Sequence, residues 1–132
     1  SKIKFVYRDY PLPFHKGAIP AAEGSQCAGD QSKFWEMHDK IFQEQDKQGQ
    51  GTIQFTKADV VKWAGQIGLN MVSFNQCLNS GKYKAEVEKD IADGTTAGVS
   101  GTPTTFINGR SLVGAQPLSS FKTIIDEELS KK

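Results

Sequence analysis

The 132-residue sequence lacks the features that mark several large classes of protein. It holds no apolar run close to the roughly 20 residues that cross a bilayer, so we expect no membrane span. Its 16 basic and 15 acidic residues nearly cancel, so nothing indicates binding to nucleic acid or to an anionic membrane surface. No internal repeat or low-complexity segment is present, and the length suits one domain with a core of its own.

Cysteine and histidine are both scarce. The two cysteines, Cys27 and Cys77, lie far apart in the chain, so they form no Cys-x-x-Cys motif, and their number does not fix a redox compartment. Together with His15 and His38 they show no paired ligand spacing, so we expect neither a metal site nor a cofactor. His38 lies on the apolar face of an expected helix, where a packed histidine is favoured over a catalytic one.

Residues 46–57 superficially match the calcium loop of an EF-hand, with Asp46 as first ligand, Gly51 as turn glycine and Ile53 as apolar anchor. The chemistry does not fit, because glutamines stand at two carboxylate positions and Lys57 takes the place of the bidentate glutamate. We therefore expect a polar loop between helices.

Apolar periodicity and capping residues predict a largely helical chain that begins with a strand and ends with a hairpin and a helix. A strand is expected at residues 3–7. Helices are expected at residues 18–28, 33–45, 56–67, 70–80 and from Tyr83 to near Gly94 or Gly98. Three aromatic residues within the helical stretches are either groove aromatics or core, and their helical spacing favours core: Trp35, Trp63 and Phe74.

The stretch at residues 99–113 has the clearest local signal. Asn108-Gly109, between two β-rich runs, is the strongest short hairpin signal. Pro103 has no N–H for a sheet ladder, so it must precede the strand at residues 104–107. A cis peptide bond could be retained there, but the rarity of cis X-Pro bonds favours an ordinary trans proline. A final helix starts after Pro117, and its inward-facing residues are expected to be Leu118, Phe121, Ile124, Ile125 and Leu129.

Three runs in this order resemble the DsbA-like thiol–disulfide oxidoreductases of the thioredoxin superfamily: FVYRDYPL (residues 5–12), CAGDQSKFWEMHD (27–39) and GTPT (101–104). The resemblance covers essentially the whole chain. It implies an α/β, thioredoxin-like fold with an inserted all-helical subdomain. Residues 1–14 and 99–132 would be thioredoxin core elements and residues 15–98 the helical insertion. It also implies a cis peptide bond before Pro103.

The sequence departs from the family pattern in one respect. The family has a central strand followed by a helix that opens with Cys-x-x-Cys, and neither has a counterpart here. We therefore expect an incomplete fold, a chain cut from a longer protein, and no thiol–disulfide turnover by this chain alone. An open sheet edge would be covered by dimerisation, with strand exchange as one route.

The resemblance also implies a site and a location. Gly101, Thr102 and Pro103 match the loop that offers backbone hydrogen bonds to an extended substrate, here a cysteine-containing exported polypeptide. The parent protein would act in the periplasm or another extracytoplasmic compartment, although this chain carries no signal peptide. Cys27 and Cys77 are either a structural disulfide, as in family members with a second bridge, or two small core thiols.

Two other functions remain open. The chain could be a non-catalytic, thioredoxin-like module that binds a peptide or supports assembly. It could also be a structural helical domain with a fortuitous hairpin.

Overall fold

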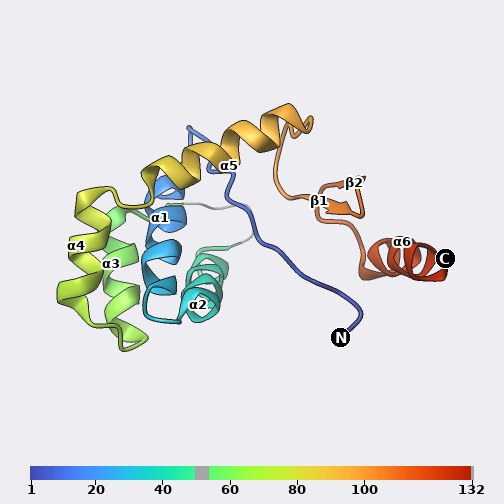
Figure 1. Cartoon of the computed structure of the whole chain (residues 1–132). Helices are drawn as coiled ribbons and strands as arrows, with labels where there is room; N and C mark the ends of the chain where they lie inside the picture. The colour runs from blue at the N-terminus through green and yellow to red at the C-terminus, as the bar shows by residue number, and fades with distance from the viewer. Residues whose placement is uncertain (50–53, 132) are drawn as a thin grey trace. The chain divides into compact units, whose positions relative to one another are not determined.

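The structure, a computed structural model, describes residues 1–49 and 54–131. The chain divides into two compact units, named here the helical unit (Asp9–Ala92) and the terminal unit (Ser1–Arg8 with residues 93–131). The elements, labelled in Figure 1, are α1 (Ala18–Gly29), α2 (Phe34–Asp46), α3 (Lys57–Gln66), α4 (Met71–Ser80), α5 (Lys84–Thr96), β1 (Thr104–Ile107), β2 (Arg110–Val113) and α6 (Leu118–Ser130).

Local capping chemistry explains where the helices of the helical unit begin and end. Thr56 and Asp59 form a capping box at the start of α3, in which the Thr56 amide donates to the Asp59 carboxylate at 2.8 Å. Asn70 caps α4 through a bond from the Ser73 amide, 3.1 Å long. Gly81 ends α4 in the left-handed conformation, with φ of +68°. These helices are confirmed where the sequence predicts them.

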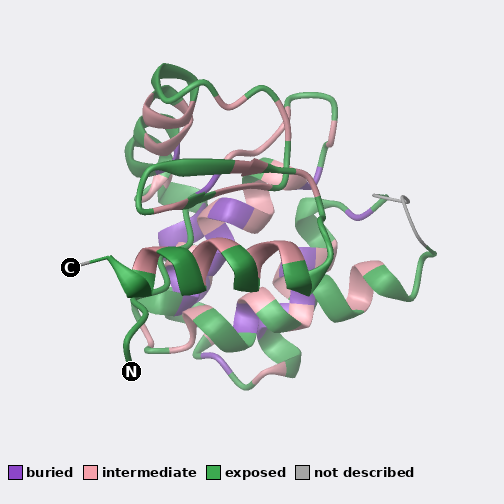
Figure 2. Ribbon diagram, turned by 90° about the vertical axis from the view of Figure 1, so that its right-hand side faces the viewer, coloured by how far each residue is buried: buried purple, intermediate pink, exposed green. Residues whose placement is uncertain are grey.

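The helical unit holds the hydrophobic core. α1 packs against α2, α3 and α4, and most buried residues, which are purple in Figure 2, belong to these four helices. Trp63 and Phe74 are buried, which confirms them as core, whereas Trp35 is 47% exposed, so its assignment to the core was wrong. The cluster comprises Cys27, Ala28, Met37, Ile41, Phe55, Val60, Trp63, Ala64, Leu69, Phe74, Cys77 and Leu78.

The terminal unit contains the sheet and the last helix. β1 and β2 pair antiparallel with Thr104 opposite Val113 and Ile107 opposite Arg110. Asn108 and Gly109 both have positive φ, 48° and 84°, as the predicted two-residue turn requires. α6 contacts β1, and Arg110 of β2 reaches the acidic end of α6. The Arg110 guanidinium lies 2.7 Å from the Glu127 carboxylate.

Two expectations for this unit are wrong. Residues 3–7 form no strand, and the sheet of the described residues contains β1 and β2 alone. Alternation of apolar residues marks strand propensity, but a strand also needs a hydrogen-bonded neighbour. In α6, none of the apolar residues is buried, and Leu118 is 82% exposed. Periodicity gives a helix its apolar face but does not supply the surface that covers it.

Within residues 1–49 and 54–131, no helix combines the length and the apolar character needed to cross a bilayer.

Candidate functional site

The loop at residues 101–103 leads directly into β1. Its Thr102–Pro103 peptide bond is cis. Two hydrogen bonds fix the loop: the Thr104 hydroxyl donates to the Gly101 carbonyl at 2.7 Å, and the Gly114 amide donates to the Pro103 carbonyl at 2.8 Å. Thr102 and Pro103 are exposed, and Gly101 is half-buried. A backbone segment held by its own bonds and exposed beside a strand is suited to pairing with an extended peptide.

Cys27 and Cys77 form a disulfide that joins α1 to α4, with 5.9 Å between their Cα atoms. Both lie in the core of the helical unit, with Cys27 1% and Cys77 9% exposed. The chain has no other cysteine. Its two cysteine sulfurs are therefore both held in one buried bond, which leaves no thiol for nucleophilic chemistry.

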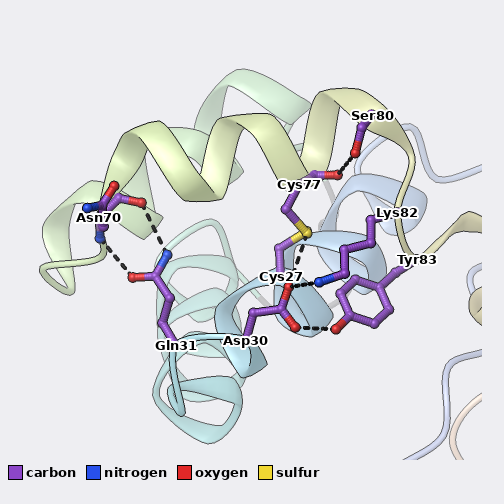
Figure 3. The surroundings of a disulfide bond; sticks show 8 residues. All are labelled: Cys27, Asp30, Gln31, Asn70, Cys77, Ser80, Lys82 and Tyr83. Atoms are coloured by element: carbon purple, nitrogen blue, oxygen red, sulfur yellow. Dashed lines mark hydrogen bonds and ion pairs between the residues drawn. A yellow bond between two sulfur atoms is a disulfide. The ribbon is translucent and has the colours of Figure 1, made fainter.

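A polar cluster lies against this disulfide, and Figure 3 shows its members turned toward one another. Asp30, one residue beyond α1, has Oδ2 3.8 Å from the Cys77 Sγ. The same Oδ2 accepts a bond from the Lys82 Nζ at 2.6 Å, and the Tyr83 hydroxyl donates to Oδ1. The cluster therefore ties the end of α1 to the segment between α4 and α5.

Hydrogen bonding sets the protonation of this cluster. Bonds from Lys82 and Tyr83 lower the pKa of the Asp30 carboxyl below its usual value. The same carboxylate raises the pKa of the Lys82 ammonium and of the Tyr83 hydroxyl. At neutral pH the cluster is therefore a carboxylate held by one ammonium and one protonated phenol.

A second pair of hydrogen bonds joins the end of α1 to the start of α4. The Gln31 side chain donates to the Asn70 carbonyl at 3.1 Å and accepts from the Asn70 amide at 2.8 Å. Because Asn70 is also the cap of α4, this pair fixes the start of α4 against the end of α1 (Figure 3).

The histidines serve local contacts. The His15 ring packs edge-on against Phe14, and the His38 Nδ1 lies 3.1 Å from the Asp39 carboxylate. No group of three or more potential metal ligands occurs in the part of the chain that the structure describes. In the calcium-like segment, residues 50–53, with Gly51 and Ile53 among them, lie outside the described residues.

The structure places the sequence-derived candidates in two separate sets. Gly101, Thr102 and Pro103 belong to the terminal unit, and the disulfide belongs to the helical unit. Sequence reasoning missed Asp30, to which it gave no role of its own. Asp30 is three residues after Cys27, and Lys82 is five after Cys77. Only knowledge of the disulfide would have brought these positions together.

The chain has relatives among known proteins. A profile of the family described as Thioredoxin matches residues 1–127. The chain is 31% identical over 126 residues to Na(+)/H(+) antiporter NhaA 1 of Salinispora arenicola, covering 95% of this chain and 18% of that protein. It is 32% identical over 111 residues to Na(+)/H(+) antiporter NhaA 3 of Salinispora tropica, covering 83% of this chain and 16% of that protein. The chain therefore spans less than a fifth of these curated relatives.

A solved structure shares the fold. It is a thioredoxin-like oxidoreductase from Silicibacter pomeroyi DSS-3, with a TM-score of 0.80 and 20% sequence identity. The match covers 96% of this chain and 69% of that chain. This likeness confirms the predicted thioredoxin-like fold with a helical insertion.

Proposed function

Since the chain belongs to the thioredoxin family and is a DsbA-like member of that superfamily, we propose that it is the peptide-binding portion of a thiol–disulfide oxidoreductase. Its substrates would be cysteine-containing polypeptides, bound along Gly101, Thr102 and Pro103. The observation that carries the proposal is the exposed loop backbone beside β1, a strand whose one partner among the described residues is β2. An extended peptide can add to the other edge of such a strand.

Nuclear magnetic resonance tests this binding directly. An extended cysteine-containing peptide is titrated into the ¹⁵N-labelled chain, and the matched control is the same peptide with alternate backbone amides N-methylated. We expect shifts at the amides of Gly101, Thr102 and β1 with the first peptide and their loss with the second, because methylation removes the N–H donors. Shifts confined to the helical unit would contradict the proposal.

Catalytic turnover by this chain alone is not part of the proposed function. Disulfide exchange needs a thiolate of lowered pKa and a resolving thiol close to it. Both cysteines of the chain form one buried disulfide instead. The parent protein would supply the reactive pair from elsewhere.

An extracytoplasmic location is part of the proposal. Disulfides persist in oxidising compartments and are rare in the reducing cytosol of most organisms. The Cys27–Cys77 bridge supports an oxidising location for the native protein. Expression with and without an export signal, followed by thiol alkylation and mass measurement, gives the oxidised fraction in each compartment. Full oxidation after cytosolic expression would remove this support.

A second candidate is a non-catalytic peptide-binding or assembly module. The observation that favours it is that a similar sequence, 31% and 32% identical, makes up less than a fifth of two proteins named for Na(+)/H(+) antiport. The reading frame upstream of the Ser1 codon discriminates between the two candidates. A strand followed by Cys-x-x-Cys favours the oxidoreductase, and a frame without them favours the module.

We also propose that the chain self-associates. No hydrophobic residue of the terminal unit is buried among those described, and Phe5 and Val6 are 69% and 62% exposed. An open strand edge beside apolar surface is a common site of strand exchange between copies. Size-exclusion chromatography with light scattering at micromolar concentration is expected to show a dimer. A monomer that unfolds cooperatively would contradict the proposal.

A further inference from the structure

The two cysteines of the Cys27–Cys77 disulfide differ in how deeply they are buried. Both cysteines belong to the hydrophobic core, but Cys27 is 1% exposed and Cys77, near the end of α4, is 9% exposed. Cys77 is therefore the less deeply buried end of the bridge, and we expect an external thiol to attack its sulfur rather than that of Cys27. Attack there expels the Cys27 sulfur as a thiolate into an apolar site, which makes it a poor leaving group.

A negative charge lies next to the Cys77 sulfur. The Oδ2 of Asp30 is 3.8 Å from the Cys77 Sγ, and 32% of the Asp30 side chain is exposed. Bonds from Lys82 and Tyr83 hold this carboxylate in place and ionised (Figure 3). Since the nucleophile in disulfide exchange is a thiolate, it must approach against this charge.

Lys82 acts in the opposite sense. Its ammonium is 2.6 Å from the Asp30 Oδ2 and offsets part of the negative field, although its side chain is 54% exposed. The carboxylate oxygen lies 3.8 Å from the Cys77 Sγ. The field at the Cys77 sulfur is therefore expected to remain repulsive to anions, and a Lys82 variant tests this sign.

We propose that Asp30 is an electrostatic guard of the Cys27–Cys77 disulfide, one that disfavours attack by anionic thiolates on the Cys77 sulfur.

The guarded reaction is ordinary reduction by an external monothiol. One thiolate bonds to Cys77 Sγ as the S–S bond breaks, and Cys27 leaves as a thiolate that takes a proton from water. A second thiolate then attacks the external sulfur of the mixed disulfide, which releases Cys77. Two external thiols are oxidised to one disulfide, and two electrons enter the protein. The guard would keep this structural bridge out of exchange with thiols around it, whichever function the chain serves.

The test compares two small monothiols of different charge under native conditions. Cysteamine thiolate has no net charge, and mercaptoethanesulfonate thiolate has two negative charges. The rate of reduction is measured by acid quenching, alkylation and intact mass. The readout is the ratio of the cysteamine rate to the mercaptoethanesulfonate rate, because loosening of the fold would raise both rates and leave their ratio unchanged.

Three variants are expected to change the rate ratio differently. In Asp30→Asn the ratio is expected to fall about threefold or more, because one unit of negative charge near the sulfur is gone. In Lys82→Gln it is expected to rise. In the matched control Glu44→Gln it is expected to stay constant, since Glu44 is also held by two lysines, Lys40 and Lys47, but belongs to α2 and not to the Asp30 cluster. Molar salt should lower the wild-type ratio toward that of Asp30→Asn.

An unchanged ratio in Asp30→Asn would overturn the proposal, even if both rates rise. A lower ratio in Lys82→Gln would also overturn it, because the ammonium would then be the source of the selectivity.

Discussion

Asp9 has a buried carboxylate in an unfavourable setting. It is 5% exposed, its amide donates to the Asp90 Oδ2 at 2.9 Å, and its own Oδ2 accepts from the Gln26 side chain at 3.0 Å. Burial raises the pKa of Asp9 above its ordinary 3.8, and the charges of Asp90 and Glu86 raise it further, while the Gln26 bond opposes them. The folded protein therefore retains this proton to a higher pH than the unfolded chain.

The sign of the resulting pH dependence follows from proton counts. Between pH 3.8 and the raised native pKa, the native state binds more protons than the unfolded state, so stability falls as the pH rises through this window. Asp9→Asn removes the charge and keeps an acceptor for Gln26. We expect it to raise the free energy of unfolding at pH 7 by about 1 kcal/mol. Urea unfolding at pH 7 and below pH 4 measures this. A gain of equal size at both pH values would contradict the electrostatic cause.

At the scale of elements, the disulfide fastens α1 to α4. It closes a loop of 50 residues in the unfolded chain, which in the chain-entropy model is worth up to about 4 kcal/mol. The double substitution Cys27→Ala with Cys77→Ala is expected to lower the free energy of unfolding by several kcal/mol. Urea unfolding of the variant and of reduced wild type measures the effect of the covalent bond. A loss below about 1 kcal/mol would contradict a structural role.

The close packing of α1 on α3 depends on a glycine. A Cβ at Gly24 would lie 2.8 Å from the Val60 Cγ1, a stiff β-branched side chain in the core. Gly24→Ala is therefore expected to destabilise the fold by about 1–3 kcal/mol. The matched control is Gly65→Ala in α3, where the nearest atom would be the Met71 Sδ at 3.9 Å.

Gly65→Ala should stabilise the protein slightly, by up to about 1 kcal/mol, because alanine favours the helix and finds room there. Thermal unfolding followed by circular dichroism compares the two variants. Equal shifts in the same direction would show that helix propensity, rather than space between α1 and α3, decides both outcomes.

Elements with local signals were predictable from the sequence. The caps Thr56 and Asn70, the stop at Gly81 and the turn at Asn108-Gly109 all act through neighbours a few residues away. The strand at residues 3–7 and the burial of α6 depend on surfaces that no local pattern specifies, and both expectations failed. The Asp30 cluster was missed for the same reason, since its parts are 52 and 53 residues apart.

At the scale of the whole molecule, stability is expected to be uneven. All the buried hydrophobic residues among those described lie in the helical unit, and Figure 2 shows no buried residue on α6, the helix leading to the C-terminus. Amide hydrogen exchange at low protein concentration is expected to show strong protection in α1, α3 and α4 and weak protection in β1, β2 and α6. Protection of α6 equal to that of α4 would contradict this distribution.

The site was predictable only in part at this scale. The resemblance at residues 101–104 pointed to the loop beside β1, and the family and the fold are confirmed. The pairing of Cys27 with Cys77 could not be decided from the sequence, because a disulfide depends on an approach of α1 and α4 that spacing does not show.

We propose that this thioredoxin-fold chain binds polypeptide without exchanging disulfides, because both of its cysteine sulfurs are held in one structural disulfide. Insulin reduction by dithiothreitol, followed as turbidity, tests it most directly. With the purified chain at micromolar concentration, the account predicts precipitation at the rate of dithiothreitol alone. An acceleration that grows with the concentration of the chain and disappears in the Cys27→Ala, Cys77→Ala variant would contradict it.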